Sequence, residues 1–242
     1  MGSIFERPGL HYISHRGFRP LAPDNSLPGF EYAGLLRQWA IETDVQKTKD
    51  GVLVCCHDGT VDATYNGTGA IQDMSWKELQ QLRMNVGSRV ECFTEEQKRM
   101  PLFSEYLVIC KRFGSVPFIE LKTDDVQPVI QAVRDAGFED EEVVMSSTVL
   151  SRLEETRKHT SKMFVHWIFA QEEQLHRIVK LGNAGISWFI SDVSDCPPEK
   201  IQCTREMGLK VCLRAGDSIT SVKQMIAMGL DYIPTNCMHM SL

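Results

Sequence analysis

Several features are missing from this sequence of 242 residues, and each absence excludes a class of protein. None of its eight cysteines stands in a C-x-x-C pair, so the zinc-ribbon and thioredoxin motifs are absent. Nowhere do about 18 apolar residues run together, so the sequence predicts no membrane-spanning helix. No G-x-G-x-x-G motif follows the first predicted strand, which removes the main signature of a dinucleotide-binding fold.

Positive charge is also scarce. Lys and Arg number 26 against 32 Asp and Glu, and the net charge of −6 argues against a protein that grips nucleic acid along a broad face. No block of five like charges forms a basic arm or an acidic tail. The first residues lack the apolar run of a signal peptide. We therefore expect a cytoplasmic protein with a small-molecule substrate, no nucleic-acid partner and no integral membrane segment.

Short apolar segments alternate with amphipathic ones along most of the chain. Enrichment in β-branched and aromatic residues predicts eight strands, at residues 10–14, 40–45, 116–121, 143–146, 162–169, 186–190, 210–213 and 231–234. Apolar positions at steps of three and four predict helices at residues 103–112, 126–137, 148–159, 172–181, 198–207 and 218–228. Regular alternation of strand and helix favours a parallel sheet, and eight such units favour a closed (β/α)₈ TIM barrel.

One region breaks this rhythm. Residues 52–56 continue the second strand as a hairpin, and the polar, turn-rich stretch 60–101 that follows is too long for a simple loop. We interpret residues 60–101 as an insertion at the rim of the active site, with one short helix near residues 75–82. The whole chain, residues 1–242, is then a single barrel domain.

Acidic side chains stand at the ends of predicted strands, where apolar residues are otherwise expected. Glu42 and Asp44 share one face of their strand because side chains alternate, and Glu120 ends the third strand. Barrel enzymes keep their active sites at the carboxyl ends of the strands, so these three carboxylates are expected to converge there. Crowded carboxylates repel one another unless a cation lies between them, and oxygen ligands favour Mg²⁺ or Ca²⁺ over zinc.

Basic groups and histidines occupy the neighbouring positions. Arg16 and Lys122 supply fixed positive charge that suits a phosphate. His15 and His57 titrate near neutral pH and are the natural general acid and base. Together these groups indicate metal-assisted cleavage of a phosphate ester. His166, in a strand without charged neighbours, is expected to be structural.

Seven short motifs in a fixed order resemble the glycerophosphodiester phosphodiesterase family. The resemblance is dense over residues 10–122, and beyond them only the order of strands and helices agrees. The motifs are HRG at 15–17, PDNS at 23–26, ETDVQKTKDG at 42–51, HD at 57–58, NGTG at 66–69, MPLFSEYL at 100–107 and IELK at 119–122.

The resemblance implies a TIM barrel with an insertion after strand two, of the kind found in phospholipase-C-like phosphodiesterases. It also implies hydrolysis of glycerophosphodiesters to glycerol 3-phosphate and an alcohol. By matching position, it assigns the divalent cation to Glu42, Asp44 and Glu120, the acid and base roles to His15 and His57, and substrate binding to Arg16, Lys122 and Asn25.

Two alternatives stay open, and three positions depart from the family pattern. The same histidines would suit a lyase-type phosphodiesterase that stops at a cyclic phosphate, and the fold would also suit a barrel that binds a phosphorylated metabolite without turnover. Asp24 stands where relatives usually have Glu, Leu213 lies in V-C-L-R where relatives have a W-T-V-N-like run, and Asn236 replaces the Asp of a T-D-x-P pattern. These changes concern the wall around the alcohol or glycerol end of the substrate.

Overall fold

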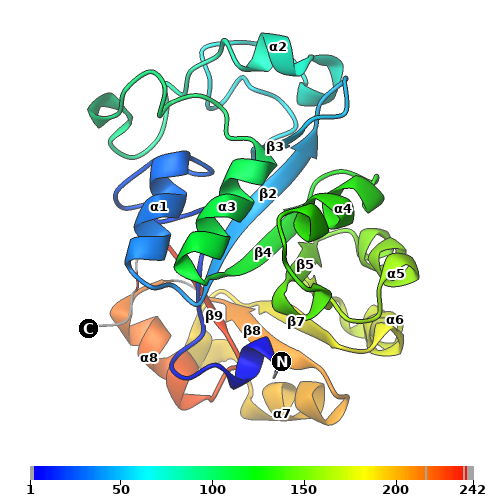
Figure 1. Ribbon diagram of the computed structural model, residues 1–242. Coiled ribbons are helices and arrows are strands. Elements are labelled where there is room, and N and C mark those ends of the chain that lie inside the picture. The colour runs from blue at the N-terminus through cyan, green and yellow to red at the C-terminus, as the bar shows by residue number, and fades with distance from the viewer. Residues whose placement is uncertain (1–2, 216, 237, 239–242) are drawn as a thin grey trace.

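Eight parallel strands form one curved sheet with helices on its outer face, in a computed structural model that describes residues 3–215, 217–236 and 238 (Figure 1). The hydrogen-bonded order is β8-β7-β6-β5-β4-β2-β1-β9. The N–H of Asp231 donates to the carbonyl of Val211 (3.1 Å) and brings the two ends of the sheet together. The strands are β1 (Tyr12–Ser14), β2 (Ala40–Lys47), β4 (Val116–Leu121), β5 (Val144–Ser147), β6 (Phe164–Trp167), β7 (Ala184–Phe189), β8 (Lys210–Arg214) and β9 (Ile233–Thr235).

The nearly closed barrel confirms the expected TIM-barrel class, with shifts at several element boundaries. The strand expected over residues 162–169 is shorter, since Phe169 adopts a left-handed φ of 57° that a strand cannot contain. The helix expected from residue 172 begins with a 3₁₀ turn over Glu172–Gln174. The α-helices of the barrel are α1 (Leu27–Leu35), α3 (Phe103–Phe113), α4 (Gln127–Asp135), α5 (Leu150–His159), α6 (Leu175–Leu181), α7 (Pro198–Glu206) and α8 (Ile219–Ala227).

Side-chain alternation divides the apolar residues into two layers. Ile41 and Val45 of β2 face outward and pack with the helices, whereas Ala40 faces the barrel interior with Phe118 of β4. Trp39 closes the lower end of the interior, where its indole N–H donates to the carbonyl of Ile4 (3.1 Å). The lower interior is therefore packed with apolar side chains, and polar groups occupy the upper positions of the same faces.

The region after β2 forms a separate layer at the carboxyl end of the barrel. Strand β3 (Leu53–Cys55) pairs antiparallel with β2, as the expected hairpin requires. The segment that follows contains η2 (Ile71–Asp73), the short helix α2 (Trp76–Leu79) and η3 (Val90–Cys92). It lies beyond the ends of β2 and β3 (Figure 1), and buried residues Val61, Tyr65, Ile71, Leu79 and Met84 hold it together. The insertion after strand two is thus a packed unit next to the mouth of the barrel.

A helix that spans a membrane needs a minimum length and apolar character. None of the helices among the residues that the structure describes is long and apolar enough to cross a bilayer.

Candidate active site

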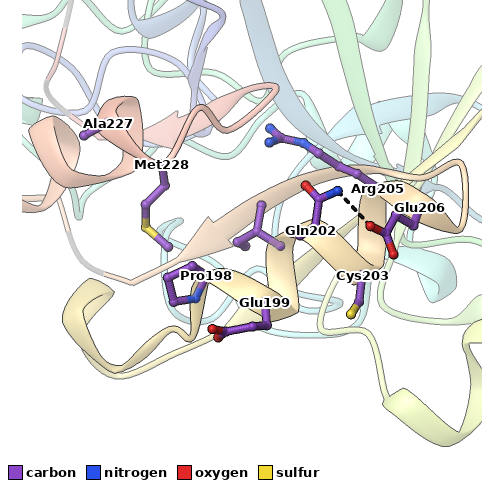
Figure 2. A pocket seen from close by; sticks show the side chains of 9 residues that line it. Pro198, Glu199, Gln202, Cys203, Arg205, Glu206, Ala227 and Met228 are labelled. Carbon is purple, nitrogen blue, oxygen red and sulfur yellow. Dashed lines mark hydrogen bonds between the residues drawn. The ribbon is translucent and has the colours of Figure 1, made fainter.

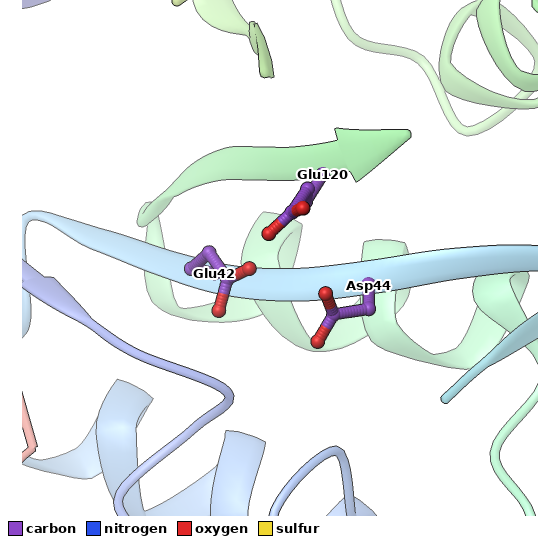
Figure 3. Close-up of side chains that lie close together, drawn as sticks. All are labelled: Glu42, Asp44 and Glu120. Atoms are coloured by element: carbon purple, nitrogen blue, oxygen red, sulfur yellow. The ribbon is translucent and has the colours of Figure 1, made fainter. Parts of the chain in front are cut away.

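Three carboxylates meet at the carboxyl ends of β2 and β4. Asp44 and Glu120 are partners in the parallel register, and Glu42 lies two residues before Asp44 on the same face of β2. One oxygen from each of the three side chains lies within 4.8 Å of the others (Figure 3). The residues are only 5%, 0% and 5% exposed for Glu42, Asp44 and Glu120. The structure therefore brings together the three acids that the sequence pattern singled out.

Burial and mutual repulsion perturb the acids. Burial raises the pKa of Glu42 well above its ordinary value, and the charges of Asp44 and Glu120 raise it further. Burial and Asp44 likewise raise the pKa of Glu120. Burial acts in the same direction on Asp44, but Lys122 and Arg16 outweigh it and keep the pKa of that carboxyl below its ordinary value. The cluster thus holds more negative charge than its own surroundings compensate.

Arg16 and Lys122 contact the acids directly. The ammonium of Lys122 lies 2.6 Å from Glu120 and 3.2 Å from Asp44. The Nε atom of Arg16 lies 3.4 Å from Asp44, and its Nη1 lies 3.3 Å from Asp24. The shorter carboxylate at position 24 is therefore still within reach of Arg16. Both expected phosphate-binding cations lie beside the carboxylate cluster.

The loop after β1 fixes these contacts through its backbone. The N–H of Arg16 donates to Oε2 of Glu42 (2.7 Å) because Arg16 adopts a left-handed φ of 58°. Gly17 has a φ of +83°, and a Cβ there would lie 2.8 Å from the backbone of Gly29. Only glycine fits that close approach, which explains the glycine of the HRG motif.

Asn25 is joined to strand β2 by every polar atom of its side chain. Its Nδ2 donates to Asp44 (2.9 Å), and its Oδ1 accepts from the hydroxyl of Thr43 (2.7 Å) and from the N–H of Asp44 (3.2 Å). Its N–H donates to the carbonyl of Arg16 (2.9 Å). The structure therefore places Asn25 beside the acids, where it orients Asp44.

His15 occupies the end of β1 in a defined tautomer. Its Nδ1 lies 3.0 Å from Oδ1 of Asn236, and Arg19 donates to that same Oδ1 over 3.1 Å. Because arginine is only a donor, the shared atom is the amide oxygen, so Nδ1 of His15 carries the hydrogen. Burial, together with the charges of Arg16 and Arg214, lowers the pKa of His15 to about 3. The ring is neutral at pH 7, with its lone pair on Nε2.

His57 lies in the chain that follows β3. Its Nδ1 lies 2.7 Å from Asp58, and its side chain is 40% exposed. The carbonyl of His57 accepts from Gln46 of β2 (3.3 Å), which ties the histidine to the strand that carries Glu42 and Asp44. The two expected acid and base residues therefore reach the carboxylates from different strands.

Sequence analysis missed two residues of the same pocket. Arg214 ends β8 and lines the pocket together with His15, Glu42 and Glu120. His166 lines it as well and is buried, with its Nδ1 2.5 Å from the hydroxyl of Tyr232, a contact that agrees with the structural role expected of it. Arg214 carried a usable signal, because it is a charged residue at the end of a strand, as Glu120 is.

Another hollow lies on the outer helical layer, between α7 and α8 (Figure 2). Arg205 and Met228 belong to its lining, and Gln202 donates to Glu206 (2.8 Å) within it. It shares no lining residue with the pocket that Glu42 and Glu120 line. We assign it no part in the chemistry.

The fold and the pocket define a class of enzyme. Oxygen ligands suited to a hard cation, flanking histidines and adjacent cations at the mouth of a barrel suit the cleavage of phosphodiesters. The sequence model of the glycerophosphoryl diester phosphodiesterase family matches residues 15–238. The chain belongs to this family and is a phosphoric diester hydrolase, as the resemblance implied.

Individual relatives agree over nearly the whole chain. A glycerophosphodiester phosphodiesterase from Caldanaerobacter subterraneus subsp. tengcongensis is 28% identical over 232 residues, which cover 93% of each protein. The crystal structure of one from Agrobacterium tumefaciens superposes with a TM-score of 0.79 at 25% identity, over 95% of this chain and 97% of that one. A phosphodiesterase from Oleispira antarctica, solved with its product sn-glycerol-3-phosphate, gives 0.82 at 22% identity over 93% and 92% of the chains, and supports the fold.

Proposed function

We propose that this protein hydrolyses glycerophosphodiesters to glycerol 3-phosphate and an alcohol, with a divalent cation held by Glu42, Asp44 and Glu120. The observation that carries the proposal is the buried acid cluster of Glu42, Asp44 and Glu120, in a chain of this family. The names of the relatives point to the same substrate class.

The three acids suit a hard cation such as Mg²⁺ or Ca²⁺. Their oxygens converge within 4.8 Å, and oxygen-only ligands are what these ions prefer. Oδ1 of Asp44 is buried and accepts no well-aligned hydrogen bond from any residue that the structure describes, although Lys122 lies 3.2 Å away. When bound, the cation would neutralise the acids and stabilise the charge that develops on the phosphate oxygens.

The histidines divide the proton transfers between them. His15 is neutral with its Nε2 lone pair available, so it takes the proton from the attacking oxygen. His57 gives a proton to the oxygen of the leaving alcohol, and the contact of its Nδ1 with Asp58 orients the ring for that transfer. If a hydroxyl of the substrate attacks first and forms a cyclic phosphate, the two histidines exchange these roles when water opens it.

Arg16 and Lys122 allow an anionic substrate to approach the acids. Both lie within 3.4 Å of Asp44, so their charge stands where a phosphate would meet the cluster. Asn25 holds Asp44 in place and thus supports the same site. In this proposal residues 60–101, within a single domain of residues 1–242, cover the site and select the alcohol part of the substrate.

Phosphorus NMR of the products tests the proposal against its alternatives. A glycerophosphodiester incubated with the protein and Mg²⁺ or Ca²⁺ should yield the glycerol 3-phosphate signal. Accumulation of a cyclic phosphate that is not opened would instead indicate a lyase. Binding of the diester without any new phosphorus signal would indicate a barrel that binds phosphorylated metabolites.

A further inference from the structure

Arg214 lies at the mouth of the barrel on strand β8, across the pocket from the acids on β2 and β4. It ends β8, and side-chain alternation places it on the same interior face as Cys212. It lines the pocket that contains Glu42 and also the adjoining cleft formed with Asn236. Its guanidinium lies over the ring of Phe169, with 5.3 Å to the ring centroid.

The charge of Arg214 has no direct acidic partner among the described residues, although Glu42 and Glu120 line the same pocket. Among the residues that the structure describes, no Asp or Glu lies within ion-pair distance of Arg214, whereas Lys122 contacts Glu120 and Arg16 contacts Asp24 and Asp44. Burial and the charge of Arg214 lower the pKa of His15 and of His166, so both rings are neutral and neither supplies a negative charge to Arg214. A half-buried guanidinium that forms no ion pair with any described residue is a position that favours an anion.

The strand order shows which part of a substrate reaches this position. The acids lie on β2 and β4, His15 lies next to them on β1, and Arg214 follows on β8 beyond β9. A phosphate that contacts the acid cluster and His15 therefore directs one of its ester groups toward Arg214. The glycerol part of every glycerophosphodiester is uncharged, so an anion at Arg214 belongs to the alcohol part.

We propose that Arg214 is a specificity-determining residue that binds an anionic group, a carboxylate or a second phosphate, on the alcohol part of the substrate. The proposal rests on the function proposed above and adds the class of glycerophosphodiester that the protein prefers. Phe169 holds the guanidinium by its ring face, which leaves the N–H groups at the edge of the guanidinium for the anion.

Two substrates that differ by one carboxylate provide the test. Glycerophosphoserine carries the carboxylate and glycerophosphoethanolamine lacks it, so the ratio of their kcat/KM values isolates the contribution of the anion. Wild-type protein should prefer glycerophosphoserine by about tenfold or more, as a charge-assisted hydrogen bond implies. Arg214→Met should remove this preference by raising KM for glycerophosphoserine alone, and Arg214→Lys should restore part of it.

The control is Lys223→Met, which removes one positive charge from an exposed position on α8 and should leave the ratio unchanged. An equal loss on both substrates in Arg214→Met would overturn the proposal, because Arg214 would then act on the phosphate or on His15. Wild-type protein that turns over both substrates equally well would overturn it too. Absence of turnover on every glycerophosphodiester would refute the proposed function itself, and with it this inference.

Discussion

The amide oxygen of Asn236 lies 3.0 Å from Nδ1 of His15. An amide fixes the tautomer of the imidazole but adds no negative charge. His15 consequently keeps a low pKa of about 3, because burial and two arginines act on it and the charge of Asp44 opposes them only weakly. The contact with Asn236 sets the orientation of the expected base, whereas burial, Arg16 and Arg214 keep it neutral.

Asn236→Asp should move the acid limb of the pH profile of kcat/KM to higher pH. The introduced carboxylate stabilises the protonated imidazole, and an opposite charge at this distance raises a pKa by about 1 unit or more. Since a base works only in its neutral form, activity is lost as the pH falls through this raised pKa. The measurement is kcat/KM from about pH 2.5 to 9, with the imidazole proton shifts of His15 followed by NMR over the same range. If Asn236→Asp shifts neither the acid limb of kcat/KM nor the NMR titration of His15, the role given to His15 is contradicted.

Glu42→Gln should stabilise the metal-free protein at alkaline pH and abolish its stabilisation by Mg²⁺ or Ca²⁺. The folded-state pKa of Glu42 lies well above the ordinary 4.5. The stability that its proton provides is therefore complete below pH 4.5 and is lost as the pH rises through the raised pKa. Glutamine avoids that loss and still accepts the N–H of Arg16, but it removes a charged ligand.

Thermal unfolding in chelator and in excess cation, at several pH values, checks this prediction. The matched control is Glu173→Gln, which alters an exposed glutamate and should respond to cation as wild type does. A Glu42→Gln variant that gains as much stability from the cation as wild type would place the cation elsewhere.

His15→Ala and His57→Ala should each reduce turnover by at least about 10²-fold, as the loss of a general acid or base does. His57 is 40% exposed, so its replacement removes little packing. Circular dichroism and unfolding midpoints should show folded variants, which separates a chemical loss from a structural one. Activity within a few-fold of wild type in either variant would remove that histidine from the mechanism.

Gly17→Ala should destabilise the protein more than Gly51→Ala. Both glycines have left-handed φ values, +83° and +85°, but only at Gly17 would a Cβ meet backbone atoms, at 2.8 Å from Gly29. We expect about 1 kcal/mol from the strained φ at Gly51 and a further loss of similar size or more at Gly17. Denaturant unfolding measures both. Equal losses would mean that the loop after β1 relaxes without cost.

The acid cluster could be predicted from the sequence because its members are close in the chain or end consecutive predicted strands. Glu42 and Asp44 differ by two positions, and Glu120 ends the next barrel strand, so alternation and the parallel register were sufficient. The contact of Asn236 with His15 escaped prediction because the two residues meet only when the barrel closes. No local pattern reports a contact between residues 221 positions apart.

Helix α1 was absent from the expected helices for a local reason. It contains Pro28, Gly29 and Gly34, which are poor helix formers in isolation. Pro28 is tolerated because it stands in the first turn, where its missing N–H costs no helix hydrogen bond. Gly34 is explained by a tertiary contact, because a Cβ there would collide with the ring of Phe113 in α3. Close packing of two helices, rather than propensity, selects that residue.

The most direct test of the central claim is the release of glycerol 3-phosphate from a panel of glycerophosphodiesters, assayed in parallel with Mg²⁺, Ca²⁺ and chelator. The proposed site predicts release with at least one of the two cations, none in chelator, and none with Glu42→Gln under any condition. Release that persists undiminished in chelator, or in Glu42→Gln, would contradict the assignment of a cation to Glu42, Asp44 and Glu120.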